Sequence, residues 1–87
     1  MMLAPFAHYY VERVTTSERN AELVWHGPRR FASVAEAAAH AVERLAEVHA
    51  MGQPWNTRAL RAVLWLVPAD GEPVRAGVAT RHGFQAD

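Results

Sequence analysis

Residues 31–52, Phe-Ala-Ser-Val-Ala-Glu-Ala-Ala-Ala-His-Ala-Val-Glu-Arg-Leu-Ala-Glu-Val-His-Ala-Met-Gly, carry the end signals of an α-helix. Ser33 is suited to cap the N-terminus, and Glu36, three residues later, completes a capping box. Gly52 follows the last apolar residue, where a left-handed C-cap is expected. The sequence therefore predicts a helix over about 34–51. Its apolar stripe, at helical period, consists of Val34, Ala38, Ala41, Leu45 and Val48.

The opposite side of this helix carries polar side chains. They are Glu36, His40, Glu43, Arg44 and Glu47. A helix at the surface of a globular protein normally turns such residues towards water. We interpret this side as a solvated surface, which makes the helix a scaffold.

Two strands are predicted before the helix. Residues 6–15 are rich in aromatic and β-branched residues, which are typical of strands. Residues 21–26 alternate between apolar and polar, and the residues between the two segments have the composition of a turn. The two segments therefore form a hairpin. Since alternate strand residues point to opposite faces, Tyr9 and Tyr10 place an aromatic ring on each face.

The segment 57–67 after the helix leaves two alternatives open. Leu60, Val63, Leu64 and Val67 fit the helical spacing, but the apolar run that ends at Val67 is followed by an Asp-Gly turn and an alternating segment. Such a turn favours a second hairpin, with strands over about 61–67 and 73–80 and a loose tail over 82–87. The predicted fold is an α+β two-layer sandwich, ordered β-β-α-β-β. One long helix covers one face of a mainly antiparallel four-stranded sheet.

Size and composition narrow the possible functions. Eighty-seven residues predict a single small domain over 1–87. The chain has no Cys, which excludes disulfides and thiolate metal sites, and its formal charge of zero counts against nonspecific phosphate binding. The N-terminus has no basic region, and the longest apolar run is too short to span a membrane. We therefore expect a cytoplasmic protein without a membrane segment or a cofactor.

One helix covers only one face of a sheet, so the uncovered face is the place to look for function. The first and third predicted strands carry large apolar side chains in both directions. A contiguous exposed apolar surface often marks an interface. We predict a small non-catalytic protein that binds a protein partner, most simply itself as a homodimer, with Tyr10, Val63 and Trp65 in the interface. The alternative is that loops and termini cover this face.

A second functional hypothesis is binding of single-stranded nucleic acid. Arg61, Arg75 and Arg81 belong to the second predicted hairpin, and Trp65 lies between them in sequence. Arginine interleaved with aromatic side chains on an open sheet binds single strands by charge and stacking. The alternative is that these arginines lie at sheet edges and block strand pairing.

Catalytic and metal-binding motifs are not found in the sequence. No pair of His has the helical spacing that presents two imidazoles to one ion, although His8 and His26 could be cross-strand neighbours in a two-His site. No Gly-rich phosphate loop and no nucleophile motif occurs. We therefore predict no enzyme activity and no metal site. Trp55 is expected to fold back onto the end of the helix.

The segment from Tyr9 to Gly52 resembles the N-terminal part of HicB-type antitoxins, in which a β-hairpin precedes a helix. The matching residues are Phe31-Ala-Ser-Val-Ala-Glu36-Ala37 and the Ala-rich run after them. The hairpin lacks the Asp-Leu-Pro-Gly-Cys-type signature of that family, and no DNA-binding extension follows, so no functional residue is transferred. In size the chain also resembles small phage proteins that inhibit host defence. These resemblances imply an antitoxin-like or inhibitor role as a further alternative.

Overall fold

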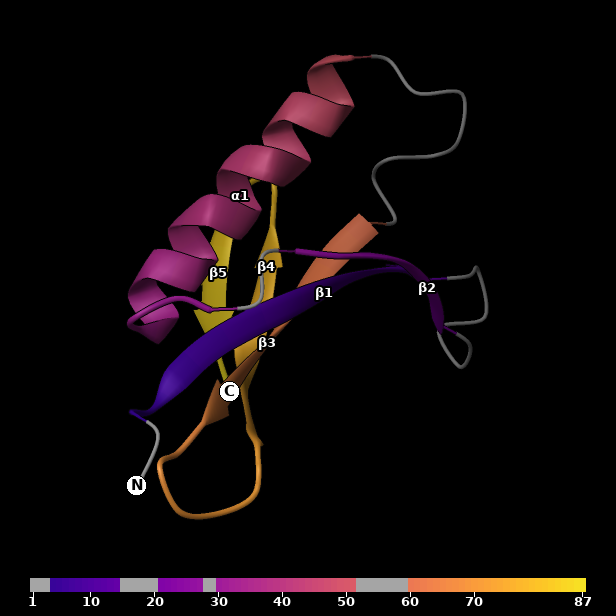
Figure 1. Cartoon of the computed structure of the whole chain (residues 1–87). Coiled ribbons are helices and arrows are strands. Elements are labelled where there is room, and N and C mark those ends of the chain that lie inside the picture. Colours follow the sequence, from indigo (N-terminus) through magenta and orange to yellow (C-terminus); the bar gives the residue numbers. More distant parts are fainter. Residues whose placement is uncertain (1–3, 15–20, 28–29, 52–59) are drawn as a thin grey trace.

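The computed structural model describes residues 4–14, 21–27, 30–51 and 60–87. Within these ranges one helix packs on one face of a five-stranded antiparallel sheet (Figure 1). The predicted α+β two-layer fold is therefore confirmed, with one strand more than expected. In chain order the elements are β1 (Phe6–Val14), β2 (Ala21–His26), α1 (Val34–Ala50), β3 (Leu60–Val67), β4 (Val74–Thr80) and β5 (Gly83–Ala86).

The strand order in the sheet is β2-β1-β3-β4-β5, and every pairing is antiparallel. The centre of the sheet is the pairing of β1 with β3, which runs from Phe6 opposite Val67 to Arg13 opposite Leu60. The β1–β2 and β3–β4 hairpins thus lie side by side through their first strands. The remaining strand, β5, extends the sheet beyond β4.

The prediction of a loose tail over 82–87 was wrong. Gly83–Ala86 forms β5 and pairs with β4, with Phe84 opposite Ala79. The backbone N–H of Asp87 also donates to the carbonyl of Ala76, at 3.1 Å. The free edge of β4 supplies the hydrogen-bonding partners that make this short segment extended. The helical alternative for the third segment does not hold for residues 60–67, which are strand β3; residues 57–59 lie outside the described ranges.

The predicted N-cap of α1 is confirmed. The Glu36 N–H donates to the Ser33 hydroxyl at 3.2 Å. The Glu36 carboxylate accepts from the N–H of Ala32 at 3.1 Å, one residue before the usual capping-box partner. At the other end, the N–H of Met51 donates to the carbonyl of Glu47. The predicted cap residue Gly52 lies outside the described residues.

The hydrophobic core lies between α1 and the sheet. It contains most of the predicted helix stripe, and the buried members of α1 are Ala37, Ala38, Ala41, Leu45 and Val48. Facing them are buried side chains of the three inner strands, among them Tyr9, Val11, Leu64 and Ala79. Phe31 packs against this cluster, and its backbone exchanges two 2.9 Å hydrogen bonds with Ala7. The start of the helix is thereby tied to β1.

Candidate functional site

The sheet face opposite α1, called the open face here, is organised by the register of β1 and β3. Every second residue of β1 points away from α1, and each of these lies opposite a residue of β3 that points the same way. The resulting cross-strand pairs are Phe6–Val67, His8–Trp65, Tyr10–Val63 and Glu12–Arg61. The open face therefore has an apolar and aromatic centre with a charged pair at one end. This arrangement agrees with the alternation predicted for both strands.

The three predicted interface residues lie together on the open face but differ in exposure. Tyr10 and Trp65 are half-buried, so both keep surface that a partner could cover. Val63 is only 2% exposed, although it lies outside the core cluster beneath α1. It stands between Tyr10 on β1 and Val78 on β4. Little of Val63 is left for a partner to bury, so its part in an interface would be to support its neighbours.

Two hollows meet at His26 on the β2 side of the open face. One, of about 370 Å³, is lined by Phe6, His8, His26 and Arg30. The other, of about 340 Å³, is lined by Tyr10, Glu12, Leu23 and His26. The guanidinium of Arg30 lies 4.8 Å above the ring of Phe6, which is a cation–π distance.

His8 and His26 line the same hollow, although the register places His26 opposite Tyr10 and His8 opposite Trp65. The cationic Arg30 lines it too, which opposes a metal ion there. Within residues 4–14, 21–27, 30–51 and 60–87, no group of three or more His, Asp or Glu side chains could hold a metal.

The protonation of His8 gives a first testable prediction. Burial, and secondarily the charge of His26, lower the pKa of His8 below its usual value of 6.5. The unfolded chain then binds this proton at a higher pH than the folded chain. We expect stability to be highest above about pH 6.5 and to fall as the pH drops through the lowered pKa.

Thermal melts between mildly acidic and neutral pH measure this effect. The His8→Gln variant should show a flatter pH dependence than the unmodified chain. The matched control His82→Gln, in the exposed turn after β4, should leave the pH dependence unchanged. Equal slopes in all three proteins would show that His8 is not the group responsible.

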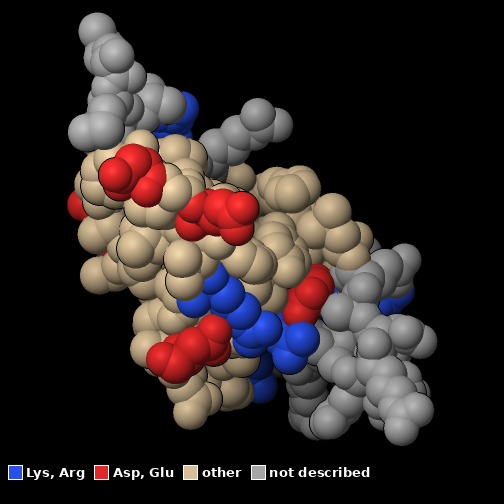
Figure 2. Space-filling model, turned by 90° about the horizontal axis from the view of Figure 1, so that it is seen from below, with Lys and Arg blue, Asp and Glu red and all other residues tan. Residues whose placement is uncertain are grey.

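The three arginines of the nucleic-acid hypothesis do not form a free basic patch. Arg61 Nε donates to the carboxylate of Glu12, and Arg75 Nε lies 3.0 Å from Asp87 Oδ2. Arg81 lies in the turn between β4 and β5. Figure 2 shows the same intermixing, with basic side chains next to acidic ones on the face in view. Phosphate binding would have to compete with these internal carboxylates.

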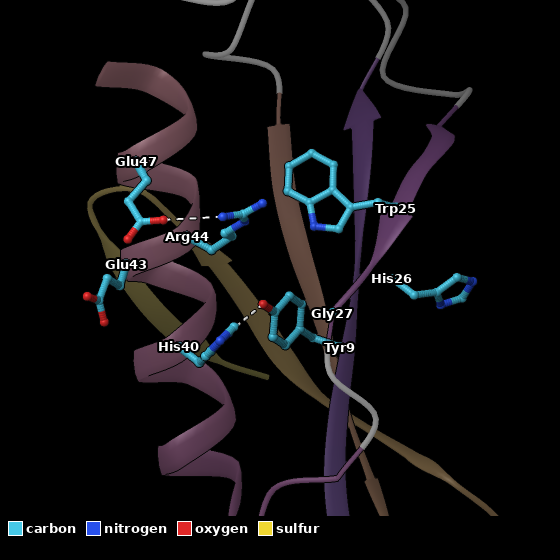
Figure 3. A pocket seen from close by; sticks show the side chains of 8 residues that line it. All are labelled: Tyr9, Trp25, His26, Gly27, His40, Glu43, Arg44 and Glu47. Carbon is cyan, nitrogen blue, oxygen red and sulfur yellow. Dashed lines mark hydrogen bonds and ion pairs between the residues drawn. The ribbon is translucent and has the colours of Figure 1, made fainter. Parts of the chain in front are cut away.

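A further cavity, on the other side of the sheet, was not predicted from the sequence. It has a volume of about 420 Å³ and lies between α1 and β2 (Figure 3). Its lining residues are Tyr9, Trp25, His26, Gly27, His40, Glu43, Arg44 and Glu47. The Tyr9 hydroxyl lies 2.7 Å from His40 Nδ1. Burial raises the pKa of Tyr9, while the charge of Arg44 acts in the opposite direction, so the phenol stays protonated at neutral pH.

Part of this cavity had a signal in the sequence. His40 and Arg44 are four residues apart, a spacing that places them on one side of the helix. The interpretation of this side as solvated agrees with the structure, in which both residues are exposed. That they also border a cavity depends on how far the sheet extends beneath the helix, which no pattern in the helix shows. Trp25 was correctly placed in a half-buried strand, but the sequence did not show that α1 stands beside it.

The predicted loop residue Trp55 lies outside the described ranges.

Comparison with protein-family models, curated proteins and solved structures found no match to this chain. In the described part of the chain, no helix has the length and apolar character needed to cross a membrane.

Proposed function

We propose that this chain is a non-catalytic cytoplasmic protein that acts by binding protein and associates with a second copy of itself through the open face. The observation that carries the proposal is the half-buried aromatic centre of this face, formed by Phe6, Tyr10 and Trp65. The helix α1 packs on the opposite face of the sheet, so it does not cover these rings. Partly exposed aromatic side chains are the usual anchors of protein interfaces.

The charges of the open face favour a second copy as the partner. In a two-fold dimer the same surface meets itself, so a face of one sign would repel its copy. Here the buried carboxylate of Glu12 is paired with Arg61. Arg75, opposite Trp65, is likewise paired with Asp87. Two such faces can approach without like charges meeting at their centre.

The size of the open face predicts a weak dimer. Five strands about 4.8 Å apart and about seven residues long give a footprint near 500 Å² per copy. Two copies would bury about 1,000 Å², at the lower end of specific interfaces. We therefore expect dissociation in the micromolar range. An antitoxin-like or inhibitor role would use the same face on another protein.

Sedimentation across the micromolar range tests this proposal. The unmodified chain should shift from monomer to dimer as its concentration rises. Trp65→Ser should weaken the dimer by about tenfold or more, because it removes a central aromatic anchor. Leu66→Ser is the matched control, since Leu66 is the next residue of β3, points to the other face and is 37% exposed. A monomer at all concentrations, or equal behaviour of both variants, would contradict the proposal.

The nucleic-acid alternative receives less support. Two of its three arginines are engaged by carboxylates of the same chain. The formal charge of the whole chain is zero. A binder of single strands gains most of its affinity from unpaired positive charge, which these two arginines do not offer.

A further inference from the structure

The cavity between α1 and β2 arises from the placement of the helix across the sheet. α1 packs mainly against β1, β3, β4 and β5, and β2 is the edge strand farthest from β5. The helix-facing side of β2 therefore forms one wall of the cavity, and the flank of α1 forms the other (Figure 3). Its volume of about 420 Å³ lies in the range of small-molecule sites.

The sheet side of the cavity is an aromatic wall. Trp25 stands opposite Val11, so its ring is on the helix side of the sheet, where it is half-buried. Tyr9 is 1% exposed, and its ring stacks on Phe31 with centroids 6.0 Å apart. The Tyr9 ring lies directly against Gly27. A Cβ at position 27 would come within 2.3–2.7 Å of ring atoms of Tyr9, so only glycine allows this approach. A flat ligand could stack on the half-buried ring of Trp25, whereas the ring of Tyr9 is already covered by Phe31 and Gly27.

The helix side presents hydrogen-bond donors. The Tyr9 hydroxyl and Nδ1 of His40 share a hydrogen bond of 2.7 Å, so Nε2 is the ring nitrogen that Tyr9 does not use, and it donates in the tautomer that carries its hydrogen there. The side chain of Arg44 extends from α1 towards Trp25, across the cavity (Figure 3). The indole N–H of Trp25 is a third donor. The cavity thus has an aromatic wall and donors from both sides.

The acidic residues at the cavity do not cancel its hydrogen-bond donors. Glu43 also lines the cavity, but its side chain is directed away from Tyr9 and Trp25 in Figure 3. Glu47 is engaged with Arg44 at 3.3 Å, and both side chains are about half exposed, at 52% and 53%. Ion pairs so exposed contribute little, so a second carboxylate could share or replace Glu47 on the guanidinium.

We propose that this cavity binds a small planar carboxylate, with its ring against Trp25 and its carboxylate on Arg44 and His40. A guanidinium accepts a carboxylate in a two-pronged geometry, and such charge-assisted hydrogen bonds are stronger than neutral ones. The site is on the opposite side of the sheet from the open face, so it does not depend on the proposed dimer.

An NMR titration of the ¹⁵N-labelled chain with benzoate tests the proposal. We expect saturable shifts of the Trp25 indole N–H and of the His40 signals, with dissociation in the millimolar range or below. Benzamide, which has the same shape without the charge, should bind about tenfold more weakly. Benzylammonium, its cationic counterpart, should not produce these shifts.

Two variants of neighbouring residues should act in opposite directions. Arg44→Gln should weaken benzoate binding about tenfold or more, and Glu47→Gln should strengthen it by about threefold because it frees the guanidinium. Arg75→Gln, which removes an exposed arginine elsewhere, is the control and should leave the affinity unchanged. No saturable shift with benzoate, equal binding of benzamide, a preference for benzylammonium, or an unchanged affinity in Arg44→Gln would each overturn the proposal. Melting curves of the variants establish that they are folded.

Discussion

Gly77→Ala is expected to destabilise the protein by about 2–5 kcal/mol and to release β5 from the sheet. Gly77 has a φ of +157°, a region that residues with a side chain rarely adopt. A Cβ there would lie 2.4 Å from the backbone oxygen of Gln85 and 2.8 Å from the ring of Phe84. Backbone cannot move aside as a flexible side chain could, so β5 must shift away from β4.

Gly83→Ala separates the two causes of this loss. Gly83 also has a positive φ, of +148°, but a Cβ there would meet nothing within 4 Å. The free energy of unfolding of this variant should therefore fall only by the strain contribution, about 1–3 kcal/mol. Denaturant unfolding measures both losses, and amide hydrogen exchange shows whether β5 alone becomes unprotected in Gly77→Ala. Equal losses in the two variants, with β5 still protected, would show that the close approach to Gln85 has no effect.

Arg61→Ala is expected to lower the free energy of unfolding by about 2–4 kcal/mol, because it leaves the carboxylate of Glu12 unpaired in the sheet. Glu12 is 8% exposed and accepts a hydrogen bond from Arg61 Nε. Removing one partner of a buried pair leaves the desolvation cost of the other without compensation. The expected loss is below that of a fully buried pair, since the side chain of Arg61 is 36% exposed.

Arg44→Ala is the matched control for this prediction. It removes an arginine from a pair with Glu47 in which both side chains are about half exposed, and it should cost less than about 1 kcal/mol. Adding Glu12→Gln to Arg61→Ala removes the unpaired charge and should recover most of the lost stability. Chemical unfolding of the three proteins measures these differences. A similar loss for both arginines would mean that the burial of Glu12 does not determine the cost.

The parts of the fold predicted correctly depend on local patterns. The cap at Ser33 and the apolar stripe of the helix place α1 within a residue of its observed bounds. The alternation along β1 places Tyr9 and Tyr10 on opposite faces, and in the structure Tyr9 lies in the core and Tyr10 on the open face. Each of these features depends on neighbours in sequence, which is why the sequence alone predicts it.

The parts that were missed depend on partners far away in the chain. β5 has only four residues, Gly83–Ala86, too few to show an alternating pattern, and it becomes a strand because the edge of β4 is free. Glu12 and Arg61 are 49 residues apart, and only the β1–β3 register brings them together. The cavity at Tyr9 and His40 likewise depends on where α1 crosses the sheet, which no helical pattern specifies.

The pairing of β1 with β3 at the centre of the sheet also determines how the chain can fold. Each hairpin closes a short loop, but the central pairing joins residue 13 to residue 60 and must close the whole segment that contains α1. The entropy of closing so long a loop is lost before the core contacts between Tyr9, Leu64 and the helix are gained. We therefore expect the docking of the two hairpins and the helix to limit the folding rate. Substitutions at the β1–β3 seam would then change the folding rate, whereas changes in β5 would mainly change the unfolding rate.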